Sequence, residues 1–105
     1  MSYKWPEKDP DETADFSVDW SRFLGSDSIV SSVFFVDDSD GTKTQVSTAQ
    51  IVNGLQFIAG TLSGNVATAR FGGGLNNVRY NITCRINTTQ GLTYERSVTL
   101  PIRNR

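Results

Sequence analysis

Few side chains in this sequence could carry out catalysis. The chain has no histidine, the residue that most often serves as a general base. Its single cysteine, Cys84, falls on the apolar face of an alternating segment, where a thiol is more often a small buried hydrophobe than a nucleophile. Carboxylates gather in residues 1–15 and at Asp37, Asp38 and Asp40, in segments too mobile to hold a catalytic geometry. The sequence therefore predicts a protein that is not an enzyme.

Two short motifs share only part of a ligand-binding pattern. The segment "DDSDG", residues 37–41, has aspartates spaced as in a calcium loop, but it lacks the closing glutamate and flanking helices of an EF-hand. The segment "FGGGLNN", residues 71–77, is glycine-rich without the Lys-Ser/Thr of a phosphate-binding loop. Both are interpreted as turns, and a lone cysteine offers no metal cluster. We expect no metal, no cofactor and no small-molecule substrate.

Length and hydropathy predict one soluble domain. A chain of 105 residues can bury a single core. The apolar run "IVSSVFFV", residues 29–36, is far shorter than the roughly 20 residues of a membrane span. No basic start followed by an apolar stretch is visible, so we expect no signal peptide, no membrane partner and synthesis in a bacterial cytoplasm.

Charge is distributed unevenly along the chain. Residues 1–52 hold ten acids and four bases, a net charge of −6, whereas residues 53–105 hold one acid and six arginines, a net charge of +5. Two interpretations stay open: two solvated faces of opposite sign, or a subunit whose acidic end meets a basic surface on a neighbour. The arginines have no accompanying aromatic stacking pattern, so nucleic acid is not the expected partner.

Alternating hydrophobicity predicts strands throughout the rest of the chain. In "VRYNITCRI" an apolar face holds Tyr80, Ile82, Cys84 and Ile86, and "TYERSVTLPIR" alternates again after the loop "NTTQG", which predicts a β-hairpin. Tyr80 is placed to make the backbone hydrogen bond of a tyrosine corner. About seven strands separated by turn residues predict an antiparallel immunoglobulin-like or fibronectin-III-like β-sandwich. In "VFFV" the pattern leaves open whether Phe34 or Phe35 faces the core.

The first fifteen residues do not fit this alternation. Pro6 and Pro10 preclude a regular helix and favour extended backbone at the preceding residues. We therefore divide the chain into an extended arm, residues 1–15, and a sandwich domain, residues 16–105. Trp20, on an alternating strand, is expected to cap the core, whereas Trp5 suits a partner surface at least as well as self-packing.

The same N-terminal residues carry a family resemblance. The pattern "W-P-x-K-D-P-D-E-x-x-D-F-x-x-D-W", continued by "FLGSDSI-x-S-S-V", resembles the small immunoglobulin-like virion proteins of bacteriophages and prophages described as fibre-to-tail adaptors. The final hairpin, "Y-N-I-T-C-R-I-N-T-T-Q-G", matches the family too, while "VFFV" departs from the Thr-Trp expected there.

The resemblance implies a structural role, with several copies arranged around a phage tail or neck to hold a fibre. Its characteristic segment contains Trp5, Pro6, Asp9, Pro10 and Asp15, and Trp20 closes it. From their chemistry we predict that residues 1–15 dock on a neighbouring virion protein, with Trp5 in an apolar pocket and the carboxylates facing arginines. The arm would then be dispensable for folding. Two alternatives stay open: a capsid decoration or head-completion protein, and a carbohydrate-binding or protein-binding module with an exposed aromatic platform.

Overall fold

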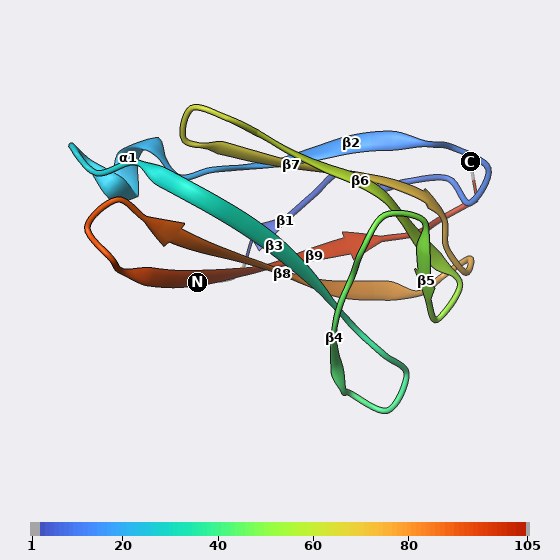
Figure 1. Ribbon diagram of the computed structural model, residues 1–105. Helices are drawn as coiled ribbons and strands as arrows, with labels where there is room; N and C mark the ends of the chain where they lie inside the picture. The colour runs from blue at the N-terminus through green and yellow to red at the C-terminus, as the bar shows by residue number, and fades with distance from the viewer. Residues whose placement is uncertain (1–2, 105) are drawn as a thin grey trace.

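A computed structural model describes residues 3–104 as two β-sheets packed face to face (Figure 1). The five-stranded sheet has the order β1-β9-β8-β3-β4, and the four-stranded sheet has the order β2-β7-β6-β5. Neighbouring strands are antiparallel except β1 and β9, which are parallel. The elements are β1 (Tyr3–Lys4), β2 (Ala14–Asp19), α1 (Ser21–Leu24), β3 (Ile29–Asp37), β4 (Lys43–Gln45), β5 (Gln50–Val52), β6 (Leu55–Ser63), β7 (Val66–Gly73), β8 (Arg79–Thr88) and β9 (Thr93–Pro101).

The predicted all-β sandwich is confirmed, and the structure adds detail that the alternation did not contain. The segment "TQVSTAQIV", residues 44–52, is divided by a turn in which Ala49 has a φ of 66°. Its first part, β4, pairs with β3 in the larger sheet, and its second part, β5, pairs with β6 in the other. The chain therefore crosses between the sheets at a point where the sequence is merely polar.

The core lies between the sheets and is built from every second residue of the long strands. Five residues predicted to share it are at most 3% exposed: Tyr80, Ile82, Cys84, Val98 and Leu100. The hairpin of β8 and β9 places Ile82 opposite Val98 and Tyr80 opposite Leu100, so the two apolar faces coincide. This paired alternation fixes the strand register, because a slip of one residue would turn the apolar face of the shifted strand toward solvent.

Tyr80 forms the predicted corner. Its hydroxyl donates a hydrogen bond to the carbonyl oxygen of Asn53 at 2.6 Å and accepts one from the backbone N–H of Leu75 at 2.9 Å. Burial raises the pKa of this hydroxyl above its ordinary value, so the group stays a neutral donor. The bonds connect the loop before β8 to the turn between β5 and β6.

Both phenylalanines of "VFFV" are buried, on opposite faces of β3. Phe34 points between the sheets, with its ring centroid 5.9 Å from that of Phe57. Phe35 lies on the outer face, where the Arg85 guanidinium carbon sits 4.5 Å from its ring centroid. Neither ring forms the exposed platform that a carbohydrate-binding surface would need. Among residues 3–104, no helix has the length and apolar character required to cross a membrane.

Candidate functional site

The N-terminal segment is attached to the larger sheet. Strand β1 runs parallel to β9, and Trp5 donates its backbone N–H to Thr99 at 2.9 Å. Lys8 continues the contact, donating its N–H to Pro101 and accepting from Arg103 at 2.9 Å. Residues 3–8 are thus an edge of the sandwich rather than an arm outside it; residues 1–2 lie outside the described part of the chain.

Trp5 is 8% exposed and belongs to the core of its own domain. The indole ring lies 5.2 Å from Phe16 and 6.3 Å from Phe71, measured between ring centroids. Its Nε1 donates a hydrogen bond to the carbonyl oxygen of Ser17 at 2.9 Å. This position corrects the expectation of an indole held in a neighbour's pocket. The residues that contact the indole lie on β2 and β7, two strands that only the tertiary fold brings together.

Lys8 is a second anchor that sequence reasoning missed. The side chain is only 1% exposed, and its Nζ donates to the carbonyl oxygens of Gly73 at 2.7 Å and Asp9 at 2.9 Å. Burial lowers the pKa of this amine, and the nearby carboxylates of Glu12, Asp9 and Asp11 oppose the change. A lysine among many charges in sequence gave no signal that it would turn inward.

Residues 7–12, which include Lys8, form a compact turn that we call the acidic turn. Glu12 accepts a hydrogen bond from the backbone N–H of Asp9 at 2.8 Å, and Asp9 accepts one from the N–H of Asp11 at 2.9 Å. The N–H of Glu12 closes the turn on the carbonyl of Asp9 at 3.0 Å. Pro6 before the turn is exposed, and Pro10 within it is half-buried. The turn therefore displays carboxylates on a stiff backbone.

Asp15 lies apart from this turn. It is exposed on β2 and receives two hydrogen bonds from Arg70 on β7, at 2.8 and 3.2 Å. Hydrogen bonding from Arg70 lowers the pKa of the Asp15 carboxyl. Of the residues expected to bind a partner, Pro6, Asp9 and Pro10 therefore lie at or next to the acidic turn, Trp5 is in the core, and Asp15 is on an outer sheet face.

The opposite charges of the two sequence halves are interleaved in space. Each sheet takes strands from both halves, and acidic residues of the first half pair with arginines of the second. The pairs are Asp15 with Arg70 at 2.8 Å and Glu7 with Arg103 at 3.7 Å. The halves are consequently not two ends of the molecule, so their difference in charge does not by itself define an acidic end and a basic end.

A second surface cluster, the aromatic end, comprises Phe23, Tyr94 and Arg96 around the buried ring of Trp20. Phe23 on α1 is 54% exposed and meets Tyr94 edge-on, with ring centroids 4.7 Å apart. The Arg96 guanidinium carbon lies 4.5 Å from the Trp20 ring centroid, and Trp20 itself is 1% exposed. In the sequence, the signal for the aromatic end was Arg96. It places a charge on the face of β9 whose alternate residues Val98 and Leu100 point into the core.

Cys84, Asp38 and Asp40, the side chains first considered for catalysis or metal binding, lie in surroundings that suit a structural role. Cys84 is buried, and burial raises its pKa to about 11 against smaller opposing effects of Trp20 and Arg96, so its thiol is neutral at ordinary pH. Asp38 and Asp40 accept hydrogen bonds from the backbone N–H groups of Ser39 and Thr42, as in a simple turn. Within residues 3–104, no three potential metal ligands come together.

A small rigid sandwich with exposed aromatic and acidic surfaces is typical of a protein that binds other proteins. Comparison with family models shows the family. Residues 8–101 match the family described as podophage GP4 fiber-tail adaptor protein gp77. The chain belongs to this family, and its function is that of a phage virion structural protein, a tail-fibre adaptor. The resemblance found in the N-terminal and hairpin motifs is thereby confirmed. No curated protein matches the chain.

Proposed function

We propose that this chain links a tail fibre to the tail or collar as one of several copies arranged in a ring. Family membership places its partners among virion tail and fibre proteins. A head-to-tail contact between copies closes into a ring when the rotation between neighbours permits. The isolated domain has to be rigid for this role, because an adaptor transmits position between the two proteins that it joins.

The observation that carries the proposal is the placement of the two exposed surfaces. The domain measures 40 × 26 × 24 Å, and strand β2 leads from the acidic turn toward α1. Figure 1 shows α1 at one end of the long axis and the segment before β2 at the other, beside the C-terminus. The aromatic end and the acidic turn can therefore engage two different proteins at once.

The two surfaces suit partners of different chemistry. Carboxylates on the acidic turn, with Pro6, Asp9 and Pro10 defining its backbone, suit an arginine-rich surface. Because the turn is already held by its own hydrogen bonds, docking orders few additional groups. At the aromatic end, Phe23, Tyr94 and Arg96 are residue types enriched at protein interfaces, and Tyr and Arg are among those that contribute most to binding energy. We propose Asp15 as a peripheral contact, since Arg70 already neutralises it.

The test compares Phe23→Asp at the aromatic end with Asp11→Lys on the acidic turn in assembled particles. Asp11→Lys should lose the adaptor itself from the particle, and Phe23→Asp should leave the adaptor bound but lose the fibre. Quantitative mass spectrometry of purified virions measures both. Gln45→Asp, at an exposed position of β4 outside both surfaces, is the control. Normal amounts of adaptor and fibre in both test variants would contradict the proposed bridging surfaces.

A further inference from the structure

Both sheets leave a strand edge open on the same side of the sandwich. In the larger sheet, β4 pairs with β3 only from Phe35 to Asp37, and the last bond on this side joins the Val46 N–H to the Phe34 carbonyl. In the smaller sheet, β5 pairs with β6 only from Leu55 to Phe57. Among the described residues, no strand pairs with the remaining edges of β3 and β6.

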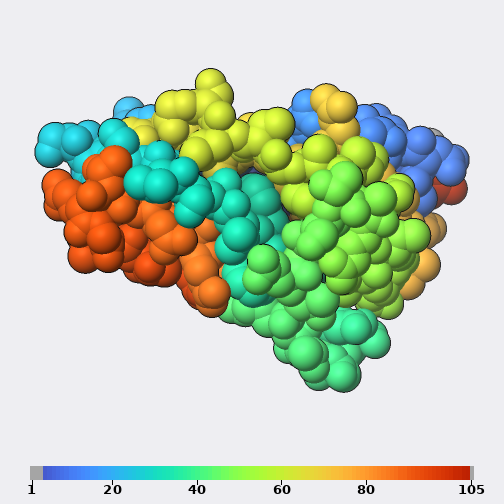
Figure 2. Space-filling view, in the orientation of Figure 1, coloured from blue at the N-terminus to red at the C-terminus, as the bar shows by residue number. Residues whose placement is uncertain are grey.

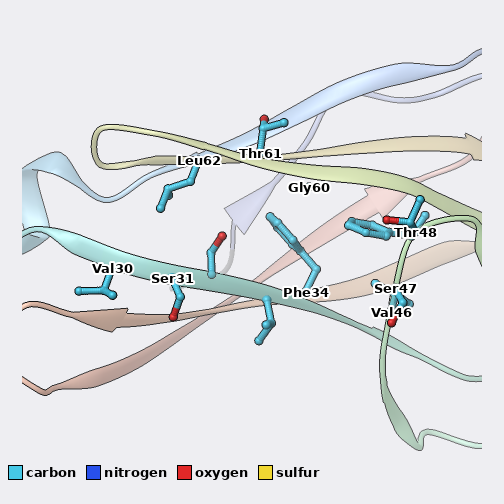
Figure 3. Close-up of a pocket in the computed structure, with 12 residues that line it drawn as sticks. Val30, Ser31, Phe34, Val46, Ser47, Thr48, Gly60, Thr61 and Leu62 are labelled. Atoms are coloured by element: carbon cyan, nitrogen blue, oxygen red, sulfur yellow. The ribbon is translucent and has the colours of Figure 1, made fainter.

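A groove of about 510 Å³ lies between these two open edges. The lining includes Val30, Ser31 and Phe34 from β3 and Gly60, Thr61 and Leu62 from β6, and Figure 3 shows the side chains of Phe34 and Leu62 pointing into the space between the two strands. The segment from Val46 to Thr48 closes one end. In the space-filling view, atoms of β3 and β6 border a hollow on this face (Figure 2). The groove has the size of a binding cleft rather than of a packing defect.

The groove contains no charged residue. Its lining consists of apolar, serine, threonine and glycine residues, with Val30 61% exposed and Leu62 37% exposed. Sheet edges that must stay unpaired usually carry lysine or another charge, a proline or a β-bulge. β3 has an irregularity between Ile29 and Ser31, and β6 has one between Phe57 and Ala59. From Ser32 onward the β3 edge is regular, uncharged and contiguous with a groove, which suits an edge that receives a strand.

We propose that an extended, uncharged segment of another virion protein adds to the open edge of β3 and places alternate apolar side chains in the groove. The backbone geometry supports this occupant. Because Phe34 directs its carbonyl toward β4, Ser32, two residues earlier, presents its N–H and carbonyl to the same side. The added strand would thus continue the ladder that β4 begins. The inference deepens the proposed function and rests on it, since the segment belongs to one of the proteins that the adaptor joins.

A second copy of this chain is a less suitable occupant than a free extended segment. Two copies related by a two-fold axis would bring groove to groove, so neither would fill the other. The projecting end of the β3–β4 hairpin carries Asp37, Asp38, Asp40 and Lys43, and the C-terminal end carries Arg103, so neither suits an uncharged lining. Residues 3–8, the remaining extended segment, are already paired with β9.

Photocrosslinking in assembled virions tests the proposal. A benzoylphenylalanine replaces Val30 in the full chain, and crosslinked peptides from purified particles are identified by mass spectrometry. We expect crosslinks to one continuous, uncharged segment of a different virion polypeptide. Crosslinks to this same chain would overturn the proposal in favour of self-association. Incorporation of the adaptor without any crosslink would also overturn it, while leaving the proposed function intact. Absence of the unmodified chain from purified particles would contradict the function itself.

Two edge variants test strand pairing independently of the crosslinker. Val30→Lys places a charge at the groove rim, and Ser32→Pro removes the outward N–H while the bonds to β8 remain. We expect both to lose the partner from the particle when the thermal midpoint of the isolated chain is retained. Ile51→Lys is the matched control, because Ile51 is 62% exposed but lies outside the groove. Retention of the partner by Val30→Lys would overturn the proposal even if Ser32→Pro failed to fold.

Discussion

Truncation of Trp5 to alanine should destabilise the domain by about 3–5 kcal/mol, the usual cost of removing a large buried aromatic side chain. The indole contacts Phe16 and Phe71 in the core and donates a hydrogen bond to Ser17, so truncation leaves both a cavity and an unpaired carbonyl. Urea denaturation measures the change. Trp5→Phe keeps most of the volume and should lose much less. Equal midpoints for the alanine variant and the parent would show that Trp5 does not serve stability.

Also at the scale of single residues, Tyr80→Phe should cost about 1–2 kcal/mol in the free energy of unfolding. Removing the hydroxyl leaves the carbonyl of Asn53 and the N–H of Leu75 without their partner in the corner. Tyr94→Phe, on a half-buried tyrosine outside the corner, is the control for loss of a phenolic hydroxyl. An unchanged denaturation midpoint for Tyr80→Phe would contradict an energetic role of the corner.

At the scale of elements, the N-terminal segment is needed for folding. Deleting residues 1–8 removes β1, Trp5 and Lys8 together, and with them the bonds to Thr99 and Pro101. We expect a clearly lower thermal midpoint and faster amide hydrogen exchange along β9, because β9 then becomes an open edge. The sequence had predicted a dispensable arm. A truncated chain with the parent midpoint would restore that prediction.

Also at the scale of elements, Asp27 connects the α1–β3 loop to the β8–β9 hairpin through a hydrogen bond from Thr89. Asp27, which is buried, accepts hydrogen bonds from Thr89 at 2.7 Å and from the N–H of Ser28 at 2.8 Å. The bond from Thr89 is the main cause that lowers the pKa of the Asp27 carboxyl below its ordinary value. Because the pKa of Asp27 is lower in the folded protein than in the unfolded chain, its carboxylate stabilises the fold. This contribution is complete above the pKa of the unfolded chain and is lost as the pH falls through the pKa of the folded protein.

Asp27→Asn should accordingly reduce the loss of stability on acidification. Thermal midpoints measured between neutral pH and about pH 2 should fall less steeply for the variant than for the parent, over the range in which unfolded aspartate titrates. Asp11→Asn, which removes an exposed carboxylate from the acidic turn, controls for the change in net charge. Parallel curves for Asp27→Asn and the parent would show that this carboxylate does not couple the loop to the hairpin.

At the scale of the whole molecule, attachment to the particle should depend on salt through the acidic turn. Exposed charges are screened over about 10 Å at 0.1 M salt, so adaptor binding should weaken as ionic strength rises. The double variant Glu7→Gln and Asp11→Asn should bind more weakly at low salt and respond less to added salt. Binding of purified adaptor to adaptor-deficient particles measures both. The same salt response in variant and parent would exclude the turn as the electrostatic contact.

The sequence by itself determined the architecture and the class of the protein. Strict alternation places Ile82, Cys84 and Val98 on shared faces, and polar turns separate the strands, so an antiparallel sandwich follows from local patterns. The corner at Tyr80 could be predicted because a tyrosine that enters the penultimate strand of such sandwiches bonds back to the upstream backbone, here at Leu75 and Asn53. The N-terminal motif was specific enough to indicate the adaptor family without any structure.

The tertiary structure decided which surfaces remain available to partners. Trp5 and Lys8 turn inward because β2, β7 and β9 meet them there, and no periodicity within residues 1–15 encodes those distant partners. Arg85 likewise covers Phe35 from a neighbouring strand. The open edges of β3 and β6 follow from how far β4 and β5 extend along them. Alternation within a strand specifies which side chains share a face, whereas contacts between strands distant in sequence decide whether that face, or that edge, is covered.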